Sequence, residues 1–230
     1  MSDAIPFWIA GRTAVGTETL TVHHPYDSRL VGTVGIPDEA QVEEAVAAAG
    51  AAAPVLAGLP AHARASALDH VARQLEQRSA EIADLIVEEN GKPIVWARSE
   101  VSRAVSTFRW AAEEVRRWSG ELQRLDTDPG GVGRLAVTRR VPRGPVLGIA
   151  PFNFPLNLVA HKVAPALAVG APIIVKPAPA TPLSALLLGE ILAETELPPG
   201  SWSVLPVPNE RMPNLVADPR LPVVSFTGSG

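Results

Sequence analysis

Four short apolar runs in the second half of the chain are each followed by small, polar or helix-starting residues. The runs GPVLGIA, APIIV, SWSVL and PVVSF are followed by PFNFP, KPAPATP, PVPNE and TGSG. Runs that are apolar on both faces, with segments long enough for a helix between them, predict parallel strands covered on both sides. Ligands of such sheets bind at the carboxyl ends of the strands, where helix amino termini present N–H groups to phosphate. We therefore expect the functional site among these four segments.

The segment after the first of these strands contains a side chain able to stabilise a developing negative charge. Asn153 lies between that strand and a predicted helix, and Pro155 suits the first turn of the helix. The Asn153 amide can donate a hydrogen bond, and a donor fixed at that place stabilises an oxyanion. An alternative interpretation is that Asn153 only supports the turn or caps the helix.

A lysine and a glycine-rich tetrapeptide follow two of the other strands. Lys176 ends a strongly apolar strand, where a buried ammonium is costly, so we expect it to reach into a polar crevice and meet a sugar hydroxyl or phosphate. The alternative is a lysine that extends to solvent from a strand end. TGSG presents backbone N–H groups beside a hydroxyl, which suits a pyrophosphate, although such tetrapeptides are also common loops.

Composition excludes several other kinds of chemistry. The 230 residues include no cysteine, so they contain no disulfide, thiolate metal site or catalytic thiol. The net charge of -4 and the scattered charges give no basic surface for nucleic acid. No apolar run approaches the roughly 20 residues of a membrane helix, and the start lacks a signal pattern, so we expect a cytoplasmic protein without a membrane partner.

Familiar single motifs for nucleotide or metal chemistry are also missing. The sequence has no GxGxxG, GxxxxGK(S/T) or HExxH segment and no serine elbow. The histidines form no spaced cluster, so we expect no metal site. Lysine is rare, and two of the three lysines lie in the segment after residue 144; the lysines are Lys92, Lys162 and Lys176.

The first half of the chain is organised differently. Residues 7–36 mix short β-like runs with turn residues and predict a ribbon at the amino terminus. Apolar residues then recur at helical spacings from Pro37 to Gly120. Gly91 suits a helix end, and a third helix is expected from about Pro93 to Ser119. We expect its tryptophans to pack in the apolar face, namely Trp96, Trp110 and Trp118.

A second ribbon is predicted between the helical half and the strands. DTDPGG breaks the helical pattern, and RLAVTRRV alternates apolar and polar residues like a half-exposed strand. The segment from Leu122 to Arg143 is therefore expected to protrude.

Taken in order, PFNFP, KPAPATP and SFTGSG strongly resemble the aldehyde dehydrogenase superfamily. The segments HHPYDSRLVGTVGIPDEAQVEEAVAAA and EENGKPIVWARSEV resemble the family's amino-terminal ribbon with its first helix and its second-to-third helix junction. The resemblance extends over essentially the whole chain. It implies an α/β fold with a Rossmann-like open parallel sheet of the aldehyde dehydrogenase type, incomplete at the carboxyl end, with a projecting β-ribbon.

The resemblance assigns catalytic roles to two residues. Asn153 would donate the hydrogen bond that stabilises the tetrahedral intermediate formed when a thiolate attacks an aldehyde. Lys162 matches a lysine that is linked in this family to positioning and proton movement near the active site.

Other residues would bind the cofactor, NAD or NADP. Lys176 would hold the adenosine ribose, Gly228 and Ser229 would meet the pyrophosphate, and the Pro151 and Phe152 backbone would line the nicotinamide side beside Asn153. Many NAD-preferring members carry a glutamate three residues after the lysine, where it would repel a 2′-phosphate. Pro179 stands there in this chain, so we expect weakened discrimination against NADP.

The resemblance also predicts how the chain is divided. Residues 1–121 and 144–230 would form part of an NAD(P)-binding domain, residues 122–143 part of an oligomerisation ribbon, and the catalytic domain would be absent. The family's nucleophilic cysteine and general-base glutamate would lie beyond TGSG, so we expect the 230 residues alone to be inactive.

Two functions remain open. The chain would be part of an NAD(P)-dependent enzyme, a dimer or tetramer when full length, that oxidises a small-molecule aldehyde to a carboxylic acid through a thiohemiacetal and a thioester. The alternative is a truncated, non-catalytic relative that binds the cofactor or modifies an assembly.

Overall fold

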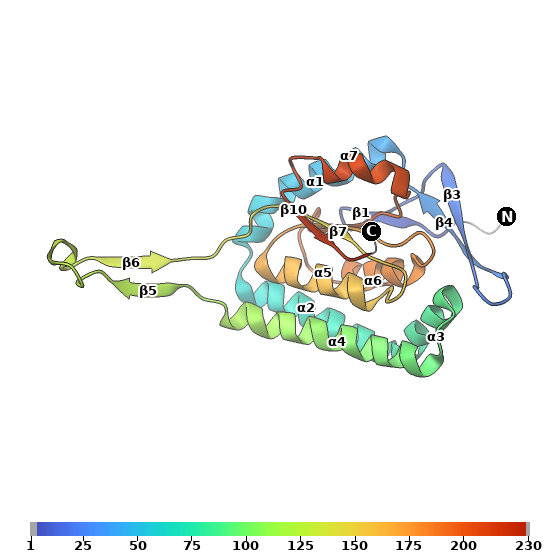
Figure 1. The fold of residues 1–230 in the computed structure, drawn as a ribbon, viewed down its shortest axis with the longest axis horizontal. Coiled ribbons are helices and arrows are strands. Elements are labelled where there is room, and N and C mark those ends of the chain that lie inside the picture. The colour runs from blue at the N-terminus through green and yellow to red at the C-terminus, as the bar shows by residue number, and fades with distance from the viewer. Residues whose placement is uncertain (1–3, 229–230) are drawn as a thin grey trace.

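The computed structural model of the chain describes residues 4–228. Its elements are, in chain order, β1 (Phe7–Ile9), β2 (Arg12–Ala14), β3 (Glu18–His23), β4 (Leu30–Ile36), α1 (Glu39–Gly58), α2 (Ala61–Gln77), α3 (Ser79–Asn90), α4 (Ile94–Arg117), β5 (Glu121–Arg124), η1 (Pro129–Gly131), β6 (Leu135–Thr138), β7 (Val146–Ile149), α5 (Asn157–Val169), β8 (Ile173–Lys176), α6 (Leu183–Ala193), β9 (Trp202–Val204), η2 (Asn209–Arg211), α7 (Met212–Val216) and β10 (Val223–Phe226). Figure 1 shows a layered body with one long ribbon extending from it.

Six strands form the central sheet in the order β10-β7-β8-β9-β1-β2. The four strands predicted from the apolar runs are parallel, with β7 between β10 and β8, and β8 beside β9. Each residue of the central strand β8 is buried, as expected for a strand covered on both faces. The open α/β sheet predicted from the sequence is confirmed.

The amino-terminal strands divide between two sheets. β1 and β2 extend the central sheet as antiparallel strands, so the sheet is mixed, whereas β3 and β4 form the separate ribbon that the sequence predicts. Trp8 ties β1 to the central sheet. Its ring lies 5.5 Å from the ring of Trp202 in β9, and its Nε1 donates to the Leu186 carbonyl at 3.0 Å.

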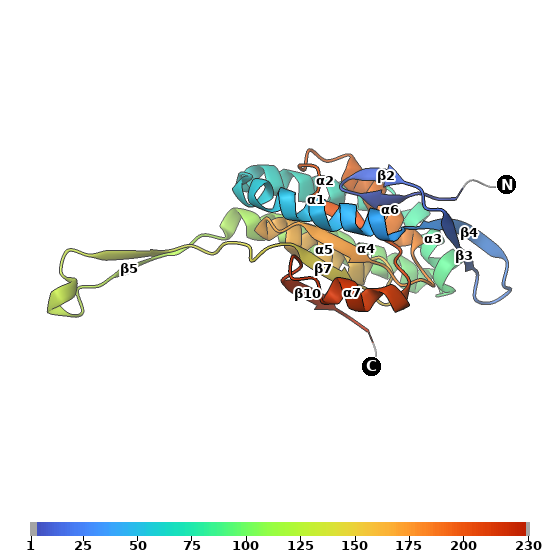
Figure 2. The same cartoon turned by 90° about the horizontal axis from the view of Figure 1, so that it is seen from above.

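Helices cover both faces of the central sheet. α1 and α7 lie on one face, α5 and α6 lie on the other, and α2, α3 and α4 form a further layer outside α5 and α6 (Figure 1, Figure 2). Apolar residues of β7, β8 and α5 fill the space between the sheet and its inner helices, among them Leu147, Ile174 and Leu167. No single helix within residues 4–228 is both long and apolar enough to cross a membrane, although α1 and α2, bent by 114°, pass that test together.

The helix expected from about Pro93 to Ser119 is α4, and it is the fourth helix rather than the third. The chain turns at Arg78 between α2 and α3, where no glycine or proline marks a break and Arg78 instead pairs with Glu81 and Glu190. Gly91 ends α3 with a φ of 73°, as its position predicts.

The packing predicted for the tryptophans of this region is wrong. Their exposed fractions are 65% for Trp96, 67% for Trp110 and 45% for Trp118. The buried stripe of α4 falls on other positions, which include Val101, Val105, Phe108, Ala112 and Val115.

The projecting ribbon predicted from the sequence is confirmed. β5 and β6 pair antiparallel from Glu121 opposite Thr138 to Arg124 opposite Leu135, and both views show the ribbon standing away from the body (Figure 1, Figure 2). Apolar side chains on it remain uncovered, with exposed fractions of 67% for Leu122 and 77% for Val137.

Candidate functional site

The carboxyl ends of three neighbouring parallel strands meet at one edge of the sheet. Ile149, the last residue of β7, pairs with Phe226 of β10 on one side and with Lys176 of β8 on the other. The segments that follow these strands are the ones that the sequence predicts to carry the site. Because the three strands end in register, the loops that follow them begin side by side.

The loop after β7 is held in place by two side chains from the junction of α3 and α4. Asn90 Nδ2 donates to the Phe152 carbonyl at 2.7 Å, and Lys92 Nζ donates to the Asn153 carbonyl at 2.7 Å. Thr181, from the loop after β8, makes a longer contact of 3.4 Å to the same Phe152 oxygen. Both backbone carbonyls are thus engaged from the helical layer, while the Asn153 side chain lies on an exposed loop.

A buried ion pair connects this loop to helix α5. Glu100 of α4 is 1% exposed, and its Oε2 accepts from Lys92 Nζ at 2.5 Å. Its Oε1 accepts from the backbone N–H groups of Leu156 and Asn157 at 2.9 and 3.0 Å. The carboxylate therefore satisfies donors at the start of α5, where the helix dipole also favours a negative charge.

A second buried carboxylate does the same for α6. Glu89 of α3 is 2% exposed and accepts from the backbone N–H groups of Leu183 and Ser184 at 2.7 and 2.9 Å, and from the Ser184 hydroxyl. Burial raises the pKa of Glu89 to about 7, and these hydrogen bonds oppose that shift. The helices that follow β7 and β8 thus both begin on a carboxylate from the α3–α4 layer.

Lys162 of α5 reaches the end of β10. Its Nζ donates to the Thr227 hydroxyl at 2.7 Å, and the residue is 5% exposed. Burial lowers the pKa of Lys162. Gly148 leaves space for the stem, because a Cβ at that position would lie 3.3 Å from Lys162 Cδ.

Lys176 lies deeper than the sequence predicts. The residue is 4% exposed, and its Nζ donates to Asn209 Oδ1 at 2.5 Å. Burial lowers the pKa of Lys176, and the nearby charge of Glu210 acts in the opposite direction. Asn209 belongs to the segment after β9, which the sequence predicts to lie at the same edge of the sheet as Lys176.

The remaining predicted cofactor residues belong to the same loops. Phe152 is 61% exposed, Pro151 and Pro179 are half-buried, and Gly228 follows β10. A Cβ at Gly228 would lie 2.7 Å from the Phe226 ring, so the backbone there tolerates no side chain without a shift. Ser229 lies outside the described residues.

The residues that support the site are not predicted from the sequence. They lie in EENGKPIVWARSEV, whose pattern predicts only a helix junction, and are Glu89, Asn90, Lys92 and Glu100. One available signal was the rarity of lysine, since Lys92 also proves largely buried, with 12% of its side chain exposed. Nothing in the local sequence shows which loop these side chains reach.

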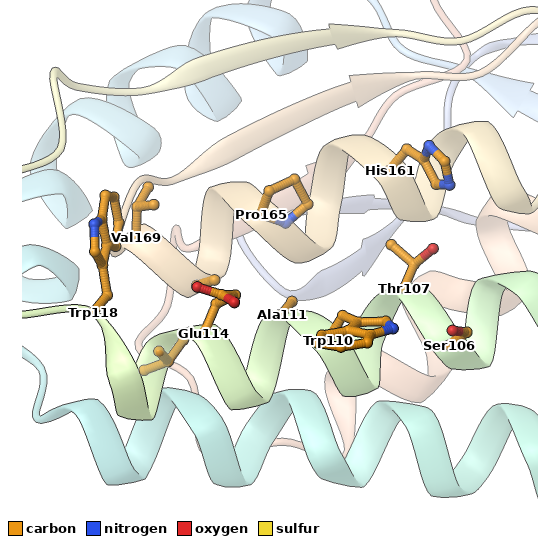
Figure 3. Close-up of a pocket in the computed structure, with 11 residues that line it drawn as sticks. Ser106, Thr107, Trp110, Ala111, Glu114, Trp118, His161, Pro165 and Val169 are labelled. Atoms are coloured by element: carbon orange, nitrogen blue, oxygen red, sulfur yellow. The ribbon is translucent and has the colours of Figure 1, made fainter.

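A groove of about 540 Å³ lies between α4 and α5, away from the ends of the strands, and is lined mainly by apolar atoms (Figure 3).

Within residues 4–228, no group of three or more His, Cys, Asp or Glu side chains could hold a metal ion. Hydrogen-bond donors, rather than metal ligands, therefore dominate the described part of the site.

Comparison with known proteins decides the family. The model of the aldehyde dehydrogenase family matches residues 10–230. The chain belongs to that family. Aldehyde dehydrogenase 21 from Physcomitrella patens, in complex with the reaction product succinate, is 42% identical with a TM-score of 0.96, over 100% of this chain and 48% of that one.

Two further relatives agree with this assignment. An NADP-dependent glyceraldehyde-3-phosphate dehydrogenase from Bacillus halodurans, complexed with NADP, is 31% identical with a TM-score of 0.94 over 99% of this chain and 49% of its own. Aspartate-semialdehyde dehydrogenase 1 of Pseudomonas canavaninivorans is 38% identical over 94% of this chain and 46% of its own length. This aldehyde dehydrogenase chain therefore spans about half the length of these relatives, and the predicted family and fold are confirmed.

The buried ion pair generates a prediction on stability. Glu100→Ala leaves Lys92 and two backbone N–H groups without their acceptor, so we expect a loss of about 3 to 5 kcal/mol in the free energy of unfolding. Glu113→Ala, on the same helix, removes an exposed pair with Arg116 and should cost less than about 1 kcal/mol. Chemical denaturation of both variants measures the difference, and equal losses would contradict the role given to Glu100.

The raised pKa of Glu89 generates a prediction on pH. Its folded value of about 7 exceeds the ordinary 4.5, so the native state binds the proton more tightly. The contribution of Glu89 to stability is then complete below about pH 4.5 and falls by about 3 kcal/mol as the pH rises through 7. We expect Glu89→Gln to remove that loss in unfolding measurements at pH 5 and 8. Asp84→Asn, on the exposed side of α3, is the control and should keep it.

Proposed function

We propose that this chain forms the dinucleotide-binding part of an NAD(P)-dependent aldehyde dehydrogenase that oxidises an aldehyde to a carboxylic acid. The observation that carries the proposal is the meeting of the β10, β7 and β8 ends at one edge, with Lys162 and Lys176 buried beside it. The chain contains no cysteine, so the nucleophilic thiol of the family's reaction would come from outside these residues.

The residues at this edge fit a dinucleotide. Lys176 presents a buried ammonium whose hydrogen-bond partner is a neutral amide oxygen, so its positive charge is available to ribose or phosphate oxygens. Gly228 gives close backbone access after β10. We assign Lys176 to the adenosine ribose, Gly228 and Ser229 to the pyrophosphate, and the Pro151 and Phe152 backbone to the nicotinamide side. The bound cofactor would accept the hydride.

Two side chains would act on the substrate. We assign to the Asn153 amide the hydrogen bond to the aldehyde oxygen as that atom gains negative charge. The Lys92 and Asn90 contacts fix the backbone of this loop, which supports a preorganised donor. Lys162 would hold or move a proton, because burial lowers its pKa and places it nearer the working range of a proton carrier.

We assign the projecting ribbon to subunit contact. Its uncovered apolar side chains, such as Leu122 and Val137, are of the kind that a second copy of the chain buries. The substrate would be a small aldehyde, in keeping with the succinate product of the Physcomitrella relative and the aspartate semialdehyde of the Pseudomonas relative.

The catalytic part of the proposal is tested with the protein as its source produces it. Asn153→Ala removes a donor to the developing oxyanion, so we expect kcat for aldehyde oxidation to fall about 10²- to 10³-fold. NAD(P) affinity, measured by titration, should change little. Asn214→Ala, an exposed asparagine on α7, serves as the control and should leave both quantities unchanged.

Other outcomes separate the two functions. Dinucleotide binding without any aldehyde oxidation would favour a non-catalytic, cofactor-binding relative. Absence of dinucleotide binding would overturn both.

Pro179 generates a prediction on cofactor choice. No carboxylate stands three residues after Lys176, so we expect NADP to bind about as well as NAD. Pro179→Glu should weaken NADP relative to NAD by about tenfold, because a carboxylate there would repel the 2′-phosphate. Ala193→Glu, which adds the same charge at the exposed end of α6, controls for net charge. A hundredfold preference of the unmodified protein for NAD would contradict the expected weak discrimination against NADP.

A further inference from the structure

An arginine borders the loop proposed to hold the oxyanion donor. The guanidinium carbon of Arg103 lies 5.2 Å from the centre of the Phe154 ring, and Phe154 directly follows Asn153. Arg103 is on α4, one helical turn before Thr107. Figure 3 shows Thr107 facing His161 of α5 across the groove between the two helices. Arg103 therefore stands where the α4–α5 groove approaches the Asn153 loop.

The charge of Arg103 is free, unlike that of the other cation at this ring. Lys92 lies 4.3 Å from the Phe154 ring centre, but Glu100 neutralises it. Arg103 is exposed, and no carboxylate within residues 4–228 lies within ion-pair distance of it. The guanidinium lies against the Phe154 ring, and because it makes no ion pair with a described residue, its N–H donors remain open to an anion.

Near Arg103 there is one further hydrogen-bond donor, His161, and the only acid among the described residues that line the groove is already paired. Burial, together with the charges of Arg103 and Lys162, lowers the pKa of His161, so the imidazole is neutral near pH 7 and can donate one hydrogen bond. The acid that lines the groove, Glu114, lies three turns further along α4 and is paired with Arg117. The walls between are largely apolar, with Trp110 and Pro165 among them (Figure 3).

We propose that Arg103, assisted by His161, binds a carboxylate at the far end of the substrate, so that the protein oxidises semialdehydes of dicarboxylic acids in preference to uncharged aldehydes. This specificity rests on the proposed function, because it places the aldehyde end at Asn153. The guanidinium matches a carboxylate with two parallel N–H donors. The Phe154 ring holds the guanidinium in place, which reduces the entropy lost on binding.

The test compares succinate semialdehyde with its uncharged methyl ester, using the protein as its source produces it. We expect kcat/KM to favour the semialdehyde. Arg103→Met keeps an apolar stem of similar length and removes the charge, so kcat/KM for the semialdehyde should fall about tenfold to hundredfold, mainly through KM. The ester should be affected less than about twofold. Arg103→Lys should restore part of the loss, because it retains the charge without the planar pair of donors.

Arg98→Met is the matched control. Arg98 lies on the same helix but lines a different pocket, with Glu76 and Arg109, so its loss should alter neither substrate. Equal rates for the two substrates in the unmodified protein, or equal losses for both in Arg103→Met, would overturn the carboxylate site while leaving the proposed oxidation intact.

A measurement without turnover separates this inference from the proposed function. If neither aldehyde is oxidised, the proposed function fails, and calorimetric titration with succinate still tests Arg103. Saturable binding that is lost in Arg103→Met and kept in Arg98→Met supports the carboxylate site. Absence of succinate binding to the unmodified protein overturns it.

Discussion

The ion pair of Lys92 with Glu100 joins the α3–α4 region to the loop after β7 and the start of α5, more than fifty residues further along the chain. The ammonium reaches the Asn153 carbonyl, and the other carboxylate oxygen reaches the first N–H groups of α5. Withdrawing two charges from water is costly, and a buried pair offsets that cost only when further hydrogen bonds satisfy its remaining atoms. Here each partner has such bonds. The pair therefore fixes geometry, and the shape of the loop after β7 depends on it.

Glu89 extends this arrangement to the next crossover helix. Together the two carboxylates make the α3–α4 layer a support on which α5 and α6 both begin. Each loop of the site runs from the end of a strand to the start of a helix. Because the carboxylate fixes the start of the helix, the loop has little conformational freedom. This explains why Asn90 and Lys92 can reach carbonyls of a loop more than sixty residues away in the sequence. Helices outside the sheet thus determine the geometry at its edge.

Much of this architecture can be predicted from local sequence. The buried contacts that hold the loops of the site in place cannot. The strand ends, the Gly91 helix end and the projecting ribbon are predictable because apolar period, glycine conformation and turn residues act locally. Residue type predicts packing for Trp96 and Trp110, but helical phase places them between the buried positions of α4. The partners of Glu89, Glu100 and Lys176 lie across the fold, and a single sequence contains no signal that pairs them. The roles proposed for Asn153 and Lys162 likewise come from family resemblance.

The cost of burying an unpaired charge also explains why lysine and arginine occupy different places in this chain. All three lysines lie in confined places, where each ammonium meets compact oxygen acceptors: Glu100 and a carbonyl, the Thr227 hydroxyl, or the Asn209 amide. A guanidinium has five donors in a rigid plane, and such sites could not satisfy them all. Several arginines instead lie at the surface and pair with acids, among them Arg12, Arg109 and Arg220. Arg103 differs from these because its guanidinium lies against an aromatic ring beside the site and makes no ion pair with a described residue.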